Sequence, residues 1–167
     1  GEKLETEKYT SYDLALDNKD ALAGDTYKNA ENYYKSIFEK TGGSINFYPD
    51  KSGALPTAEL YHRETSEFSV QDVKDFCEKH GITENVFFIS AFGITLGKYN
   101  FRKDAVFTTI YHGRNDSRLS DTVGMLVKTL PVYCDFSGST KQCLADVQQQ
   151  LISSMNNDIY PFAQISH

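Results

Sequence analysis

Histidine is the side chain most often used as a general base near neutral pH, and this chain contains four of them. They are His62, His80, His112 and His167, and no two of them are adjacent. His80 precedes Gly81 at the expected end of a helix, where a cation complements the helix dipole. His112 is the one histidine that we keep as a candidate site residue, because it stands beside a Gly-Arg turn.

Cysteine is the other common nucleophile and metal ligand, and the chain contains three: Cys77, Cys134 and Cys143. Their number is odd, their spacing is wide and no C-x-x-C pair occurs, which argues against a disulfide scaffold and against a zinc site. Each is flanked by apolar residues, so we interpret all three as small buried hydrophobic residues. The sequence therefore offers no evident catalytic residue and no metal site.

Four helices are predicted as the elements that position the remaining polar groups. Each begins at a good N-cap residue and continues with apolar residues at helical spacing. Ser69 and Asp72 resemble a capping box, and Gly93 and Gly97 within one helix suggest the close approach of another backbone. The helices are expected from Asp25 or Thr26 to Thr41, from Ser69 to Gly81, from Thr83 to about Tyr99, and from Ser139 or Thr140 to about Met155.

Three stretches rich in β-branched and aromatic residues, 58–68, 104–111 and 128–136, are predicted to be strands. Pro131 indicates an edge or a bulge in the last of them. Residues 1–23 are interpreted as a lead-in segment, partly extended and partly irregular, and residues 41–57 as a loop. The mixed order of elements predicts an α/β fold in which helices cover a sheet.

Composition limits the classes of function. The 167 residues suffice for one domain with a substantial core, and 40% are hydrophobic and 24% charged, as in soluble globular proteins. The net charge of −6 argues against nucleic-acid binding. No run of apolar residues is long enough for a transmembrane helix and no signal core occurs at the start, so we expect a cytoplasmic protein without membrane contact.

Two motifs carry a resemblance to a known family. The run Val123-Gly124-Met125-Leu126-Val127-Lys128-Thr129-Leu130-Pro131 resembles the V-G-x-F-V-N-T-x-P signature of nonribosomal peptide synthetase condensation domains. Tyr160-Pro161-Phe162 resembles the end of that family's H-Q-D-Y-P-F-E signature, and Tyr9 to Ala15 loosely resembles Y-x-D-[FY]-A-x-W. The order and spacing of the expected elements between residues 69 and 165 are similar to those of the family.

The resemblance implies a two-layer sandwich related to chloramphenicol acetyltransferase, with a mixed sheet covered by helices. Condensation domains are pseudo-dimers of two such lobes. Their His-His-x-x-x-Asp-Gly motif belongs to the N-terminal lobe and does not occur here. We therefore expect residues 1–167 to be a C-terminal lobe that is inactive alone, with 1–23 coming from the region between the lobes.

The resemblance also implies the chemistry and the partners. The parent domain would join a donor thioester to an acceptor amine, both held on the phosphopantetheine arms of carrier proteins. The expected partners are the missing lobe, the carrier domains and an adenylation domain, and no cofactor is expected to bind this chain directly. Candidate residues of the substrate channel or the lobe interface are His112, Arg114, Gly124, Lys128, Thr129 and Tyr160.

Alternatives remain for several of these residues. Arg114 would pair with a carboxylate across the lobe interface, line the channel, or form a salt bridge with Asp116 or Asp121. Gly124 would be needed either because the backbone has a positive φ there or because a substrate or a helix approaches it closely. Lys128 and Thr129 would face the channel or solvent, and Tyr160-Pro161-Phe162 would form a packing corner.

Departures from the signatures keep other functions open. Lys128 stands where the family has Asn, and Asn157-Asp158-Ile159 stands where it has H-Q-D. The alternatives are a non-catalytic docking module for carrier proteins, an acyltransferase, epimerisation or heterocyclisation relative of the same fold, and an unrelated small α/β binding protein.

Overall fold

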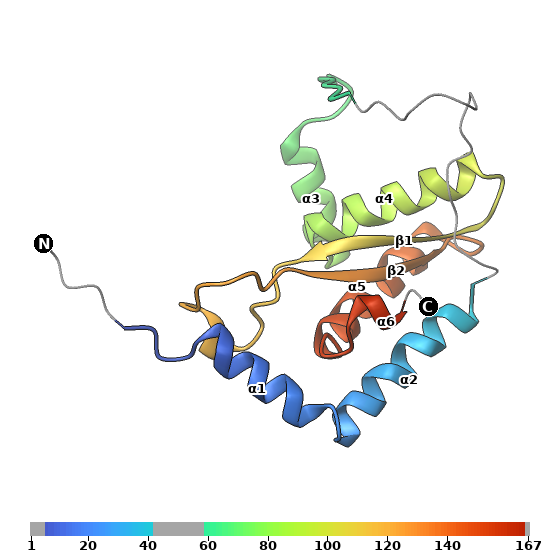
Figure 1. Ribbon diagram of the computed structural model, residues 1–167. Coiled ribbons are helices and arrows are strands. Elements are labelled where there is room, and N and C mark those ends of the chain that lie inside the picture. Colours follow the sequence, from blue (N-terminus) through green and yellow to red (C-terminus); the bar gives the residue numbers. More distant parts are fainter. Residues whose placement is uncertain (1–5, 42–58, 166–167) are drawn as a thin grey trace, which may run out of the picture.

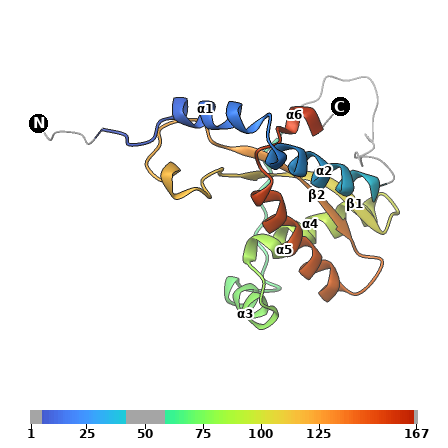
Figure 2. The same ribbon diagram turned by 90° about the horizontal axis from the view of Figure 1, so that it is seen from below.

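The computed structural model describes residues 6–41 and 59–165. His167 and, apart from Thr41, the loop expected at 41–57 lie outside these residues. Within them, helices α1 and α2 lie on one side of a β-hairpin and helices α3 and α4 on the other (Figures 1 and 2). The α/β class is therefore confirmed for the described part of the chain.

The hairpin consists of β1 (Asp104–Tyr111) and β2 (Lys128–Asp135), paired antiparallel with Tyr111 opposite Lys128. Both strands were predicted, and both are rich in β-branched and aromatic residues. The sheet was expected to be mixed, but in the described residues it has two antiparallel strands. Residues 59–68, the described part of the strand predicted at 58–68, add no strand to it.

Residues 59–68 contain no strand, so that prediction is wrong for the described part of the segment. Leu60 and Tyr61 are 85% and 84% exposed. Alternating apolar residues make a strand only when another strand accepts their backbone hydrogen bonds, and within residues 6–41 and 59–165 no strand pairs with this segment.

Pro131 lies within β2 without disrupting the pairing. The backbone N–H of Tyr133, two residues later, donates to Oε1 of Gln150 on α5 (Thr140–Asn156) at 2.8 Å instead of to β1. Because alternate backbone nitrogens of a strand point to the same side, the nitrogen of Pro131 also points away from β1. The predicted edge position is therefore confirmed, and the missing N–H costs the hairpin no hydrogen bond.

The core lies between the hairpin and the helices α4 (Glu84–Tyr99) and α5. A Cβ at Gly93 would come within 2.8 Å of Cys134 Cβ, and one at Gly97 within 2.5 Å of a Phe136 ring carbon. The predicted approach of another backbone is thus confirmed at Gly97, where a Cβ would also lie 2.7 Å from the Asp104 carbonyl oxygen, whereas the neighbours of Gly93 are side chains. The core side chains are Val86, Ile89, Val132, Cys134, Cys143, Val147 and Leu151.

The two core helices are less enclosed than their sequences indicate. The apolar character of residues 83–99 predicts burial on most sides, but Phe88 and Phe92 on α4 are about half exposed. On α5, Leu144, Val147 and Leu151 are buried as expected, whereas Ile152 is exposed and Ser154 is buried in its place. Both helices cover the hairpin with one face only, so the remaining apolar side chains lie at the surface.

Helix α3 (Val70–His80) packs beside α4, with the rings of Phe76 and Phe87 5.5 Å apart. It begins at the predicted Ser69–Asp72 capping box and ends at Gly81, whose φ is +63°. Helix α2 (Asp25–Glu39) begins after Gly24, one residue before the expected cap, and buries Ala30, Tyr34 and Ile37. The Tyr34 hydroxyl donates to the carbonyl of Ser154 at 3.1 Å, which joins α2 to α5.

The segment predicted as an irregular lead-in contains a helix, α1 (Ser11–Ala21), so that prediction is wrong for these residues. The helix starts at a capping box in which Thr10 donates its N–H and its hydroxyl to Asp13 at 2.8 Å and 2.7 Å. None of its residues is buried. It therefore lacks the apolar stripe by which helices are usually predicted.

The capping boxes predict a dependence of stability on acid. Hydrogen bonds from Thr10 and Ser69 hold the pKa of Asp13 and Asp72 below its ordinary value of 3.8. A carboxyl whose pKa is lower in the folded state stabilises the protein above its unfolded pKa and ceases to do so as the pH falls through the folded pKa. We expect the double substitution Asp13→Asn and Asp72→Asn to reduce the loss of stability on acidification.

The measurement is the urea unfolding midpoint of both proteins at pH 7 and at pH 3. The difference between the two pH values should be smaller in the double variant, because two of the responsible carboxyls are gone. Asp75→Asn on α3 is the control, since its carboxylate accepts a bond only from the exposed side chain of Gln71. Equal acid sensitivity in the double variant and in the wild type would contradict the prediction.

No helix within residues 6–41 and 59–165 has both the length and the apolar character needed to cross a membrane.

Candidate functional site

The connection between β1 and β2 is shaped by a half-buried arginine. Arg114 donates through Nη1 to the carbonyls of Leu119 and Thr122, at 2.5 Å and 3.0 Å. It therefore forms neither of the salt bridges, to Asp116 or Asp121, that the sequence left open. The guanidinium instead closes the connection onto the short helix η1 (Ser117–Leu119), a role for which its fork of donors is suited.

Gly113 allows Arg114 to take this position. Its φ is +71°, and a Cβ there would lie 1.8 Å from the carbonyl oxygen of Leu126. His112, just before it, is exposed, and its Nδ1 accepts the backbone N–H of Arg114 at 3.0 Å. The Nδ1 atom of His112 is thus already engaged in a hydrogen bond within its own turn.

Helix α1 is fastened to the same connection by polar contacts. Arg118 forms ion pairs with Asp17 at 3.0 Å and with Asp116 at 2.7 Å, and its guanidinium lies 4.5 Å from the centre of the Tyr9 ring. The hydroxyl of Thr122 donates to the carbonyl of Tyr9 at 2.6 Å. These contacts bring the two motif regions near residues 9–15 and 123–131 together.

Gly124 lies at this junction. It does not have a positive φ, but a Cβ there would lie 3.3 Å from Cβ of Ser11. Of the two explanations that the sequence left open, the close approach therefore applies, and the neighbour is the first residue of α1.

The start of β2 meets the turn after α5 through an ion pair. Lys128 Nζ lies 3.0 Å from Oδ1 of Asp158 and donates to the Asp158 carbonyl, also at 3.0 Å. The two side chains are 29% and 22% exposed, so the pair is largely withdrawn from water. Both residues belong to the signature regions, and both stand at positions where this sequence departs from the signatures.

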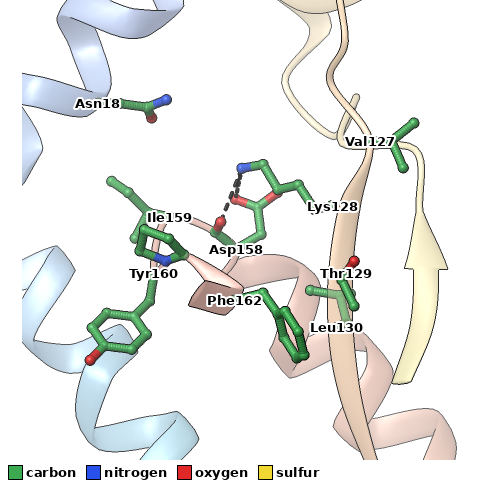
Figure 3. Close-up of a pocket in the computed structure, with 10 residues that line it drawn as sticks. Asn18, Val127, Lys128, Thr129, Leu130, Asp158, Ile159, Tyr160 and Phe162 are labelled. Atoms are coloured by element: carbon green, nitrogen blue, oxygen red, sulfur yellow. Dashed lines mark hydrogen bonds and ion pairs between the residues drawn. The ribbon is translucent and has the colours of Figure 1, made fainter. Parts of the chain in front are cut away.

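Two open cavities flank this ion pair. One, of about 380 Å³, is lined by residues of β2 and of the 158–162 segment, among them Lys128, Thr129 and Tyr160. The other, of about 450 Å³, lies toward α1 and η1. Asn18, Lys128, Asp158 and Ile159 line both cavities. Figure 3 shows Lys128 reaching from β2 to Asp158, with Asn18 facing them from α1.

Tyrosines surround the far end of this site. The Tyr160 ring packs 5.1 Å from Tyr27 and 6.2 Å from Tyr34, so the expected packing corner forms while Tyr160 also lines a cavity. Burial, with a smaller contribution from Asp158, raises the pKa of Tyr111, and burial, Tyr33 and Asp158 together raise that of Tyr34. Both hydroxyls therefore keep their protons at neutral pH, and that of Tyr34 donates to the carbonyl of Ser154.

The structure thus brings together three of the six predicted site residues: Lys128, Thr129 and Tyr160. It places His112, Arg114 and Gly124 in the adjoining connection. Sequence reasoning missed Asp158 and Asn18 as site residues. The replacement of H-Q-D by Asn157-Asp158-Ile159 was the available signal for Asp158, whereas Asn18 has none, because α1 itself was not predicted.

The arrangement supplies hydrogen bonds and a balanced pair of charges, and the residues that line it include no histidine. No group of three metal-ligating side chains occurs in the part of the chain that the structure describes. All three cysteines are buried as predicted, and none lines either cavity. The lining side chains can form hydrogen bonds with a polar molecule, and the carboxylate of Asp158 among them is already paired with Lys128.

The family model described as "Condensation domain" matches residues 1–167. The chain belongs to the condensation-domain family. Among curated relatives, the nonribosomal peptide synthetase sidC of Arthroderma benhamiae is 27% identical over 135 residues, which is 80% of this chain and 3% of that protein. The condensation-domain chain thus spans a small part of a very large relative.

Solved structures share the fold. SgcC5 of Streptomyces globisporus superposes with a TM-score of 0.76 at 19% identity, over 99% of this condensation-domain chain and 38% of that protein. The first condensation domain of the calcium-dependent antibiotic synthetase gives 0.74 at 15% identity, over 96% and 37% of the two chains. The condensation-domain fold is therefore established, with a small antiparallel sheet and helices as its described parts.

Proposed function

We propose that this chain is the C-terminal lobe of a condensation domain that joins a donor thioester to an acceptor amine, both carried on phosphopantetheine. The observation that carries the proposal is the meeting of the two signature regions, which lie thirty residues apart, at the Lys128–Asp158 pair between two cavities. An intact lobe fold with both signatures at one open site is what such a domain requires.

In this proposal the lobe holds substrates and does not move protons. A pantetheine arm is a flexible chain with neutral amides, and the first cavity suits it because the two charged residues that line it, Lys128 and Asp158, neutralise each other. The general base comes from the N-terminal lobe, in the His-His-x-x-x-Asp-Gly motif. General base catalysis contributes about 10²- to 10⁴-fold, so the chain alone should be inert.

The proposed partners follow from the assignment of this chain as the C-terminal lobe of a condensation domain. They are the N-terminal lobe, two carrier domains and an adenylation domain of a cytoplasmic assembly line. The relationship of the lobe to chloramphenicol acetyltransferase is part of the proposal as well.

The test is an amide-formation assay with carrier-bound donor and acceptor, followed by mass spectrometry of the carrier-bound product. We expect the chain alone to match a buffer control, and its combination with the N-terminal lobe of its parent to form the amide. Replacing the second histidine of the motif in that lobe should return the rate to the control. Product formation by the chain alone would contradict the division of labour between the lobes.

A second candidate is a non-catalytic module that docks partner proteins. The observation that favours it is the ion pair itself, because it places two charged groups where the signatures have neutral Asn and Gln. Under this candidate the complete parent domain would form no amide in the same assay and would still bind a carrier protein. Amide formation by the complete domain would exclude it.

A further inference from the structure

Two of the cysteines touch each other inside the core. Sγ of Cys134 on β2 lies 3.3 Å from Sγ of Cys143 on α5, and either sulfur can donate the hydrogen bond. Both residues are almost fully buried, at 0% and 1% exposure. The other cysteine of the chain, Cys77, lies on α3, and neither sulfur of the pair is recorded in contact with it.

The separation of the two sulfurs is only a little longer than that of a disulfide bond. A disulfide requires its sulfurs at about 2.05 Å, so the two atoms need to approach by roughly 1.2 Å, which is within the reach of a side-chain rotation. The sulfurs come from two elements joined by a short connection, residues 136–139, so the ends are already held together. The established fold and the proposed function assign no role to this pair.

We propose that Cys134 and Cys143 are a redox-sensitive dithiol that a peroxide converts to an intramolecular disulfide linking β2 to α5. The ionised sulfur of one cysteine attacks the peroxide oxygen and becomes a sulfenic acid, and hydroxide leaves and takes up the proton released on ionisation. The second thiol then attacks the sulfenic sulfur and expels water. The two thiols lose two electrons and two protons, and one hydrogen peroxide becomes two waters.

The hydrogen bond between the thiols assists the first step, because either sulfur can donate to the other and so stabilise it as a thiolate. Because both are buried, peroxide reaches them through local opening, so the reaction should be slow in the native protein and faster in a low, non-denaturing concentration of urea.

The experiment is peroxide treatment of the 167-residue chain, followed by thiol counting and non-reducing peptide mapping. We expect a loss of two of the three thiols, a mass decrease of about 2 Da, and one cross-linked peptide pair containing Cys134 and Cys143. The urea midpoint should rise on oxidation and return with dithiothreitol. The Cys77→Ala variant should behave as the wild type, and Cys143→Ala should show no mass decrease.

Three results would overturn the proposal. They are retention of all thiols in the folded chain while the urea-unfolded chain is oxidised, formation of sulfinic or sulfonic acids without a cross-link, and a cross-link that involves Cys77. If Cys143→Ala does not fold, Cys134→Ala serves in its place, and the peptide map of the wild type decides the pairing without either variant.

Discussion

Replacing Gly113 with alanine is expected to lower the free energy of unfolding by about 3 kcal/mol or more, the largest effect of an added methyl group among the glycines that the structure describes. Two causes act together. The φ of +71° is strained for any side chain, and the new Cβ would lie 1.8 Å from the carbonyl oxygen of Leu126. The connection must move, and Arg114 then loses its place on the carbonyls of Leu119 and Thr122.

Substitutions at two other glycines distinguish the effect of the positive φ from that of the contact with Leu126. Gly81 has a φ of +63° with nothing within 4 Å of a Cβ, so Gly81→Ala should cost about 1 kcal/mol through backbone strain alone. Gly138 has open space and no positive φ, and Gly138→Ala should change the stability by less than about 0.5 kcal/mol. Urea unfolding of the three variants measures the order. Equal losses of stability in Gly113→Ala and Gly81→Ala would show that the contact with Leu126 contributes nothing to the destabilisation.

The second large effect is expected at the Lys128–Asp158 pair. Lys128→Asn or Asp158→Gln alone leaves a largely buried charge without its partner. We expect each to cost about 1–2 kcal/mol, between the values for exposed and for fully buried pairs. The double variant removes both charges and restores the residue types of the signatures. Its cost should therefore be smaller than the sum of the two by about 1 kcal/mol.

A double-mutant cycle by urea unfolding measures this coupling. The matched control is the pair formed by Glu31 and Lys35 on α2, which has a shorter separation of 2.6 Å but side chains that are 32% and 62% exposed. Its coupling should stay below about 0.5 kcal/mol because water screens exposed helix pairs. Additive costs at Lys128 and Asp158 would show that the two departures from the signatures are independent of each other.

Local signals explain which elements could be predicted. Ser69 with Asp72, and Thr83, act as caps on the residues next to them, and the glycines of α4 indicate a packing requirement that any neighbour would meet. These effects operate within a few residues, so the sequence displays them. The signatures added the family and the general region of the site.

The wrong predictions and the missed contacts depend on tertiary packing and not on local signals. Helix α1 buries none of its residues, so periodicity had nothing to detect, and residues 59–68 have the pattern of a strand without another strand to pair with. The exposure of Phe88 and Phe92 depends on which face of α4 meets the hairpin. Lys128 with Asp158, and Cys134 with Cys143, are brought together by tertiary packing, which no spacing in the sequence indicates.

Helix α1 is attached to the molecule by a different kind of contact from the one that holds the core together. The hairpin, α4 and α5 adhere through buried apolar surface, which added salt leaves intact or strengthens. Helix α1 adheres through the Arg118–Asp17 ion pair and the contact of Arg118 with the Tyr9 ring, which dissolved ions screen, and through the neutral hydrogen bond from the Thr122 hydroxyl to the Tyr9 carbonyl. Added salt therefore weakens part of the attachment of α1, and the second cavity, which Asp17 and Arg118 line, is more sensitive to ionic strength than the apolar core beneath it.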